Sequence, residues 1–257
     1  MSQNHNNPDS TGTEVFSKRF PGTVFDLKGR RQKALKIVAV LSDAIGQALK
    51  RAEVLDLGCA AGIVSNELAT QVSLLVGTDL DRNALSYAHQ NREPNSSFLA
   101  ADAQILPFRD ASFDVVICAH VYEHVTSAEV LVKEIHRVLR VGGVCYFAAG
   151  NRLALIEPHY RLPFLSVLPI SLANVILRAT GRGHVYGEKH LTYWSLKRLV
   201  SRFQILDYTG RIVNNPQKYA AEDVVPIGSL KQTVGRSICR ITPALAPTFI
   251  FLLKKVY

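Results

Sequence analysis

The chain has 257 residues, 47% of them hydrophobic, so it can bury a large core as one domain or as one domain with an insertion. Its four cysteines are widely spaced without a C-x-x-C pair and no apolar run reaches ~20 residues, which argues against a disulfide framework, a zinc finger and a membrane-spanning helix. The net charge is +9, of which residues 151–257 contribute +10, with 15 Lys and Arg against 5 Asp and Glu, and residues 1–150 contribute −1, with 15 against 16.

The N-terminal segment Met1–Gly12 is polar and lacks the apolar stretch of a signal peptide. We expect residues 1–22 to form a disordered tail. From about Arg31 to Lys50, apolar residues recur at helical spacing, which predicts one helix that packs on a sheet edge and closes over a ligand. The residues expected on its buried face are Leu35, Ile37, Val38, Leu41 and Ile45.

Residues 54–62 predict a buried strand, a tight turn and the start of a helix. Gly58 suits a backbone conformation closed to other residues, and Gly62 lets the new helix pack close to the strand. Free N–H groups at the helix start then face a ligand. Asp56 would repel a pyrophosphate but attract an amino group, and Ala60 replaces the middle glycine of G-x-G-x-x-G, which disfavours a nicotinamide oxidoreductase.

Two further apolar strands each lead to an acid. Residues 74–78 lead to Asp79, which follows Asp56 by 23 residues. That gap is close to the ~20 expected of an acid that reads a ribose, and a carboxylate can accept from both ribose hydroxyls. Residues 98–101 lead to Asp102.

Alternation of strands and helices continues to residue 150 and predicts a parallel, doubly wound sheet. The other elements expected there are helices over Asn83–Gln90, capped by Asp81 or Asn83, and over Ala128–Leu139.

The stretch Asp56-Leu57-Gly58-Cys59-Ala60-Ala61-Gly62 resembles the first motif of class I S-adenosylmethionine-dependent methyltransferases, and the later landmarks follow in that family's order. Residues 113–120 match its fourth strand and the loop after it, and residues 138–147 match its helix, glycine turn and fifth strand. The resemblance covers about residues 50–150 and is nearest to the type 11 branch grouped with ubiquinone and menaquinone methyltransferases. It implies S-adenosyl-L-methionine as cofactor, with Asp56 at its amino group, Asp79 at the ribose and Asp102 beside the adenine amino group. The cofactor-binding residues it implies are Asp56, Gly58, Cys59, Ala60, Gly62, Asp79, Leu80, Asp102, Ala103 and Ala119.

The pattern changes after residue 150, where prolines become frequent. From Leu162 to Leu177 almost every residue is apolar, but the run is too short and too proline-broken to span a membrane. It fits a substrate lid, a pocket wall, an interfacial segment or an ordinary buried helix pair. We expect a helical lid insertion over about residues 151–195.

The C-terminal part predicts a capped helix over Ser195–Phe203, a sixth strand from Gln204–Tyr208 with Ile212–Val213, and a helix within residues 229–247. Thr248–Leu253 is the expected last strand, which in the family runs antiparallel. The fold expected is α/β: a doubly wound, Rossmann-like seven-stranded sheet, mostly parallel with an antiparallel last strand. The methyltransferase domain is expected over 23–257. Its cofactor core lies at about 50–150 and its C-terminal strands at about 204–257.

Methyl transfer from a sulfonium is an in-line displacement, so the protein mainly aligns nucleophile and methyl and excludes water. His120 and His124, after the fourth strand, are the candidate catalytic bases for a nucleophile that keeps its proton. The alternatives are that His120 only lines the cofactor loop and that His124 caps or packs the next helix. With Glu123 they share one helical face, where some relatives bind a divalent metal through Glu-x-x-Glu-His. Because His120 replaces the first Glu, a hard oxygen ligand is lost and we expect no metal.

The expected function is transfer of a methyl group from S-adenosylmethionine to an O or C atom of a small, partly apolar acceptor, lipid-linked, quinone-like or a secondary metabolite. An RNA methyltransferase and a non-catalytic binding module are the alternatives. The basic half favours an anionic partner such as acidic lipid, a phosphorylated substrate or nucleic acid, or is a solvated surface without a role. We expect a cytoplasmic protein with peripheral membrane contact and no DNA partner. The residues expected to line the acceptor pocket are His159, Tyr160, His184, Tyr186, Lys189, His190, Tyr193 and Trp194.

Overall fold

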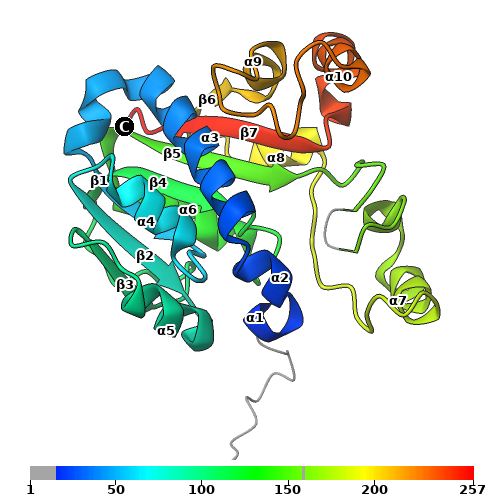
Figure 1. Cartoon of the computed structure of the whole chain (residues 1–257), viewed down its shortest axis with the longest axis horizontal. Coiled ribbons are helices and arrows are strands. Elements are labelled where there is room, and N and C mark those ends of the chain that lie inside the picture. The colour runs from blue at the N-terminus through cyan, green and yellow to red at the C-terminus, as the bar shows by residue number, and fades with distance from the viewer. Residues whose placement is uncertain (1–15, 158–159) are drawn as a thin grey trace, which may run out of the picture.

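The computed structural model describes residues 16–157 and 160–257, and they form one seven-stranded sheet in the order β3-β2-β1-β4-β5-β7-β6 (Figure 1). Strands β1 to β5 pair in parallel, and β7 runs antiparallel to both of its neighbours. The predicted fold is therefore confirmed. The strands are β1 (Glu53–Leu57), β2 (Leu74–Asp79), β3 (Ser96–Ala100), β4 (Phe113–Ala119), β5 (Leu139–Gly150), β6 (Gln204–Asp207) and β7 (Thr248–Lys254).

Helices cover both faces of the sheet. On one face, α3 (Leu27–Ile45) and α4 (Ile63–Ala69) pack on the alternate side chains of β1, β2 and β4 that point toward them. On the other face, α6 (Ala128–Val138) and α8 (Tyr193–Leu199) close a second core. The sheet is thus buried on both sides, as its near-continuous apolar strands require. Helix α5 (Arg82–Gln90) follows β2 and is capped by Asp81, one of the two predicted candidates.

The N-terminal region corrects two predictions. The tail expected over residues 1–22 is helical from Phe16 on, as α1 (Phe16–Arg19) and α2 (Pro21–Val24), and residues 1–15 lie outside the described part of the chain. The next helix starts earlier than expected and ends at Ile45, before a 3-10 turn over Gly46–Arg51. Leu35 is not on its buried face but 46% exposed.

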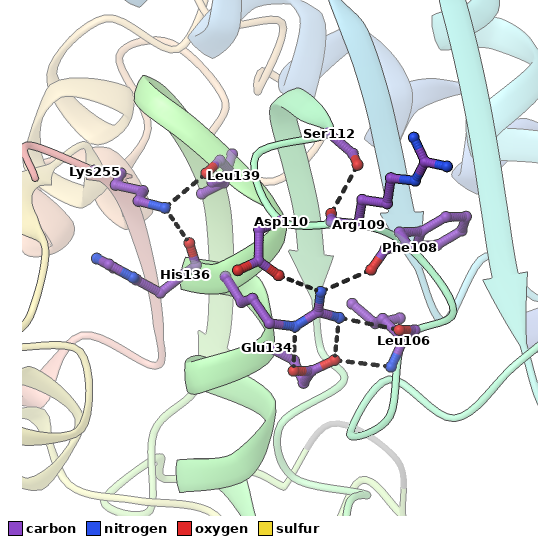
Figure 2. A network of polar contacts seen from close by, with 10 residues as sticks. Leu106, Phe108, Arg109, Asp110, Ser112, Glu134, His136, Leu139 and Lys255 are labelled. Carbon is purple, nitrogen blue, oxygen red and sulfur yellow. Dashed lines mark hydrogen bonds and ion pairs between the residues drawn. The ribbon is translucent and has the colours of Figure 1, made fainter.

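A polar network fixes the loop between β3 and β4 to helix α6 (Figure 2). Arg137 donates to the carbonyl oxygens of Leu106 and Phe108 over 3.0 and 2.7 Å. It also pairs with Glu134, whose carboxylate accepts from the Leu106 amide. Because this loop follows Asp102, the network anchors the segment that leads from Asp102 to β4.

The insertion after β5 builds a small core of its own. It contains a 3-10 turn, Leu165–Val167, and helix α7 (Ile170–Ala179), which lies away from the sheet in Figure 1. Tyr160, Leu165 and Leu177 are among its buried residues. No helix in the described residues is long and apolar enough to cross a membrane.

The C-terminal predictions hold in part. Helix α8 spans Tyr193–Leu199 instead of the predicted Ser195–Phe203, and it is capped by Thr192. Ile212–Val213 is not part of a strand but lies in α9 (Thr209–Asn214). Within 229–247 the expected helix is present as α10 (Leu230–Ile241), followed by a 3-10 turn over Pro243–Leu245.

Candidate active site

The carboxyl ends of β3, β2, β1 and β4 lie next to one another at one edge of the sheet. The glycine loop after Leu57 therefore lies between Asp79, at the end of β2, and Ala119, at the end of β4. The Ala101 amide donates to the Asp79 carbonyl over 3.1 Å, which brings the loop with Asp102 to the same edge. Most of the residues predicted to bind the cofactor converge here, where parallel α/β sheets bind ligands.

The glycine loop has the backbone that its sequence predicts. Gly58 and Gly62 have φ angles of +65° and +69°, in the region that favours glycine. A Cβ on Gly58 would lie 2.8 Å from Val121 Cγ2, and one on Gly62 would lie 2.7 Å from Ala88 Cβ. Ala60 also has a positive φ of 50° and occupies the middle of the turn. Neither glycine position leaves room for a side chain, so the loop can approach a ligand with its backbone.

Asp79 is clasped by the backbone. Its Oδ2 accepts from the Ala60 amide over 2.7 Å, and its Oδ1 accepts from the Asp81 amide over 2.8 Å. Burial raises the pKa of Asp79, and the amide hydrogen bonds oppose that shift. Each carboxylate oxygen has more than one acceptor position, so a hydroxyl pair could still donate to it.

Asp56 is 4% exposed and lies beneath the glycine loop. Its Oδ2 accepts from the Ser65 hydroxyl, at the start of α4, over 2.6 Å. Burial raises the pKa of Asp56 to about 6, against the hydrogen bond from Ser65 and the positive charges of Lys33 and Arg30. A bound cation near this carboxylate would favour its ionised form.

Two cations that the sequence did not identify face this edge from α3. Lys33 Nζ donates to the Ala119 carbonyl over 3.3 Å, and burial lowers the pKa of Lys33 to about 8. Arg30 is close enough to Asp56 and Asp79 for both to act on its charge. The edge therefore combines carboxylates with two cations, a pattern that matches a zwitterionic ligand.

The adenine end of the predicted site is more open. Asp102 is half-buried and accepts from the Gln104 amide over 2.8 Å. Ala103 is 9% exposed, and Leu80, directly after Asp79, is 68% exposed. An apolar ring could cover Leu80, whose side chain otherwise lies in water.

His120 follows β4 with a φ of 64°, so the chain leaves the strand in a turn and the helical face expected for residues 120–124 does not form. Its Nδ1 lies 3.1 Å from Oε1 of Glu123, which is fully buried. Burial would raise the pKa of Glu123, but the hydrogen bond and charge of His120 outweigh it and hold this pKa at about 2. Within the described residues, Glu123 Oε2 has no hydrogen-bond partner.

His124 is exposed and lies against the N-terminal helix α1, with its ring centroid 5.6 Å from that of Phe16. The same short helix is tied to both sides of the site. The Ser17 amide donates to Asp81 over 2.7 Å, and Arg19 donates to the Tyr160 hydroxyl and the Val185 carbonyl of the insertion. Residues 16–20, here called the N-terminal strap, thus connect the cofactor core with the insertion.

The insertion places a second acid–histidine pair next to the edge. Glu157 and His190 are buried, with Glu157 Oε1 3.7 Å from His190 Nε2. A Cβ on Gly150, the last residue of β5, would lie 2.7 Å from the His190 ring. The Lys189 amide donates to the Glu123 carbonyl over 3.0 Å, which joins this pair to the turn after β4.

The other predicted acceptor-pocket residues are not gathered at one place. Tyr193 packs on the core rings of Phe249 and Phe251, at centroid distances of 5.2 and 6.1 Å. Trp194 is 64% exposed, and His184 and Lys189 are also exposed. Tyr160 and Tyr186 are buried in the core of the insertion, and His159 lies outside the described residues.

Among the described residues, neither a metal-binding cluster nor a reactive thiol contributes to the candidate active site. In residues 16–157 and 160–257, no three His, Cys, Asp or Glu side chains are grouped so that they could hold a metal ion. Cys59, Cys118 and Cys145 are buried free thiols, and burial raises the pKa of each.

Residues 55–147 match a family model described as a methyltransferase domain. The ubiquinone biosynthesis O-methyltransferase of Coxiella burnetii is 29% identical over 107 residues, which cover 40% of this chain and 46% of that protein. The enzyme of the same name from Agrobacterium fabrum is 29% identical over 171 residues, 65% of each chain. This chain therefore matches less than half the length of the Coxiella protein.

Solved structures agree with the fold. The methyltransferase in complex with the Trm112 methyltransferase activator of Haloferax volcanii has a TM-score of 0.56 at 15% identity, over 95% of this chain and 98% of that one. An S-adenosylmethionine-dependent methyltransferase from Mesorhizobium loti has a TM-score of 0.53 at 15% identity, over 80% of this chain and 91% of that one. The family match shows that the chain carries a methyltransferase domain over residues 55–147, and the sheet order and the solved structures, at 15% identity, show the Rossmann-like fold of that domain.

Proposed function

We propose that the protein transfers the methyl group of S-adenosylmethionine to an oxygen or carbon atom of a small, partly apolar acceptor. One observation carries this proposal: Asp79 and the His120–Glu123 pair lie at the same edge of the sheet. Two backbone amides hold Asp79, and the His120–Glu123 pair follows β4. Asp79 fits a ribose, and the pair fits an acceptor hydroxyl or an acidic C–H group.

The charges along this edge fit the amino-acid end of the cofactor. Asp56 would attract its ammonium group, and Lys33 and Arg30 would attract its carboxylate. The cofactor would supply a methyl group on a positively charged sulfur. Because the leaving thioether needs no proton, the residues of the site mainly have to orient the two reactants and exclude water.

His120 is the proposed base for an acceptor that carries a hydroxyl. Ionised Glu123 accepts from Nδ1, which fixes the ring and leaves Nε2 to take a proton from the acceptor. The same carboxylate then stabilises the imidazolium that forms. The role of Glu123 is one of positioning, and His124, which lies against the strap, has no catalytic role in this proposal.

The acceptor would approach between the turn after β4 and the insertion. Tyr122 donates to the Gly150 carbonyl and accepts from the Leu191 amide, both over 3.0 Å, so the insertion begins and ends beside this turn. The buried Tyr160 and Tyr186 belong to the core of the insertion and would hold its shape rather than contact the acceptor.

The test is transfer of labelled methyl from S-adenosylmethionine to three pools: a lipid extract, small hydroxylated aromatic compounds and total RNA. Label in either of the first two supports the proposal. Label in RNA alone would favour the RNA methyltransferase that the basic residues 151–257 also suggest. Calorimetry that detects no binding of S-adenosylmethionine would favour a non-catalytic module.

A further inference from the structure

Helix α7 is apolar on two opposite sides. Ala173 and Leu177 are fully buried in the core of the insertion, whereas Leu172 and Val175, on the opposite side, are 46% and 53% exposed. An α-helix in water usually pairs one apolar face with one polar face. No part of the chain that the structure describes covers the outer face of α7, although that face has the composition of a buried one.

The turn before α7 exposes further large apolar side chains. Ile156 pairs with Pro163 in an isolated bridge, and the Phe164 amide donates to the Leu155 carbonyl over 2.9 Å. The exposed fractions of Leu155, Ile156 and Phe164 are 67%, 61% and 55%. We refer to the exposed apolar residues of this turn and of α7 as the apolar outcrop: Leu155, Ile156, Phe164, Ile170, Leu172 and Val175.

All the exposed charge on this insertion is positive. Within residues 151–157 and 160–190, both acids, Glu157 and Glu188, are buried, at 0% and 7% exposure. The cations of the same stretch are all exposed: Arg152, Arg161, Arg178, Arg182 and Lys189. A ligand that meets this surface would therefore encounter aliphatic side chains and positive charge with no exposed carboxylate.

We infer that the apolar outcrop docks on an anionic lipid bilayer. Aliphatic side chains can enter the boundary between headgroups and acyl chains while arginines contact the phosphates, which is how interfacial segments bind. RNA would satisfy the arginines but leave the aliphatic side chains in water, because proteins bind single strands with stacked aromatic rings and the outcrop has one, Phe164. Docking there would bring the insertion, and the sheet edge beside it, to a lipid-borne acceptor.

The experiment is co-sedimentation of the full chain with vesicles of phosphatidylcholine alone or mixed with phosphatidylglycerol. We expect binding to the mixed vesicles that weakens as salt is raised. The double substitution Leu172→Ser with Val175→Ser is expected to weaken binding at least about tenfold, since both side chains lose apolar contact with lipid. Replacing Arg161 and Arg178 by Gln should remove the preference for phosphatidylglycerol.

The matched control is Leu230→Ser with Ile241→Ser on α10, whose side chains are 79% and 75% exposed outside the insertion. It should leave vesicle binding unchanged. No binding to either vesicle, an equal loss in the control, or binding to RNA but not to vesicles would overturn the inference. All substituted side chains are exposed, so thermal melts of the variants should match the parent. Since the assay involves no methyl transfer, its outcome is independent of the proposed function.

Discussion

The amide of Ala60 donates a hydrogen bond to Asp79 Oδ2 over 2.7 Å, so the glycine loop after β1 is tied to the acid that ends β2. The other oxygen of Asp79 accepts from the Asp81 amide, at the entry to α5. One carboxylate thus organises both turns that would surround the ribose. The sequence motif and the distant acid are parts of one hydrogen-bonded unit.

Asp79→Asn should weaken S-adenosylmethionine binding by about ten- to a hundredfold, because each lost charge-assisted hydrogen bond costs about 1.5–3 kcal/mol. Isothermal titration calorimetry measures the effect. Glu222→Gln is the control, since it makes the same chemical change at an exposed site. An unchanged dissociation constant in the Asp79 variant would show that this carboxylate does not contact the cofactor.

The affinity for the cofactor should be highest between about pH 6 and pH 8. The pKa of Asp56 is about 6, so below this pH its carboxyl is neutral and no longer attracts the ammonium group. The pKa of Lys33 is about 8, so above this pH its amine is neutral and no longer attracts the carboxylate. A series of calorimetric titrations from pH 5 to pH 9 would show the dissociation constant rising at both ends.

Two variants test which group causes the loss of cofactor affinity at each end of that pH range. Lys33→Arg keeps its charge at pH 9, so the loss of affinity at high pH should disappear. Asp56→Asn cannot ionise, so its affinity should be lower at pH 7 and no longer fall toward pH 5. If the alkaline loss persists in Lys33→Arg, deprotonation of the cofactor's own amino group is the cause instead.

The signals that the sequence provided for this site are local. Gly58 and Gly62 have positive φ angles that their turn requires, and Asp79 ends a strand that its apolar run predicts. Lys33 and Arg30 had no such signal. They precede the first motif, in a stretch whose Lys and Arg residues have the pattern of a solvent-exposed helix face. Only the packing of α3 on the sheet brings them to the carboxyl edge.

Long-range packing also explains the predictions that failed. His120, Glu123 and His124 have helical spacing, but His120 has a φ of 64°, which no right-handed helix accommodates. Ile212 was expected in a strand, yet it is buried in the core from a short helix. The pairing of β6 with β7 ends at Asp207, so local strand propensity beyond that point has no partner strand to satisfy it.

His120→Gln should lower kcat for a hydroxyl acceptor by about 10²–10⁴, the range for loss of a general base, with the cofactor dissociation constant unchanged. Glu123→Gln should have a smaller effect on kcat, because the His120 ring loses the carboxylate that orients it but keeps its own Nε2. Steady-state kinetics measures both effects. His124→Gln serves as control, and an equal loss of kcat in it would contradict the assignment of the base to His120.

Arg19→Gln should open the N-terminal strap. The change removes hydrogen bonds to Tyr160 and to the Val185 carbonyl, and weakens the cation–π contact between Arg19 and the Phe20 ring, whose centroid is 5.1 Å away. We expect S-adenosylhomocysteine to dissociate about three- to tenfold faster, as for the loss of one or two net hydrogen bonds. Stopped-flow displacement measures this rate. Lys18→Gln, at an exposed neighbouring position, should leave it unchanged.

Arg137→Met should destabilise the fold and loosen the loop that follows Asp102. The carbonyls of Leu106 and Phe108 lose their donor, and Glu134, whose side chain is 17% exposed, loses its partner. We expect the free energy of unfolding to fall by about 2–3 kcal/mol, since hydrogen bonds between charged groups are lost and not replaced. Urea denaturation measures it.

Arg137→Lys should recover only part of this stability, because an ammonium group cannot reproduce the planar fork that reaches Glu134 and both carbonyls at once. Lys133→Met is the control. Lys133 is exposed on the same helix, so this substitution removes one positive charge without breaking the network. If the loop holds Asp102 in place as the network indicates, cofactor affinity should fall together with stability in Arg137→Met and stay at the parent value in Lys133→Met. A destabilised Arg137 variant with full cofactor affinity would show that Asp102 is positioned by its own contacts with Gln104.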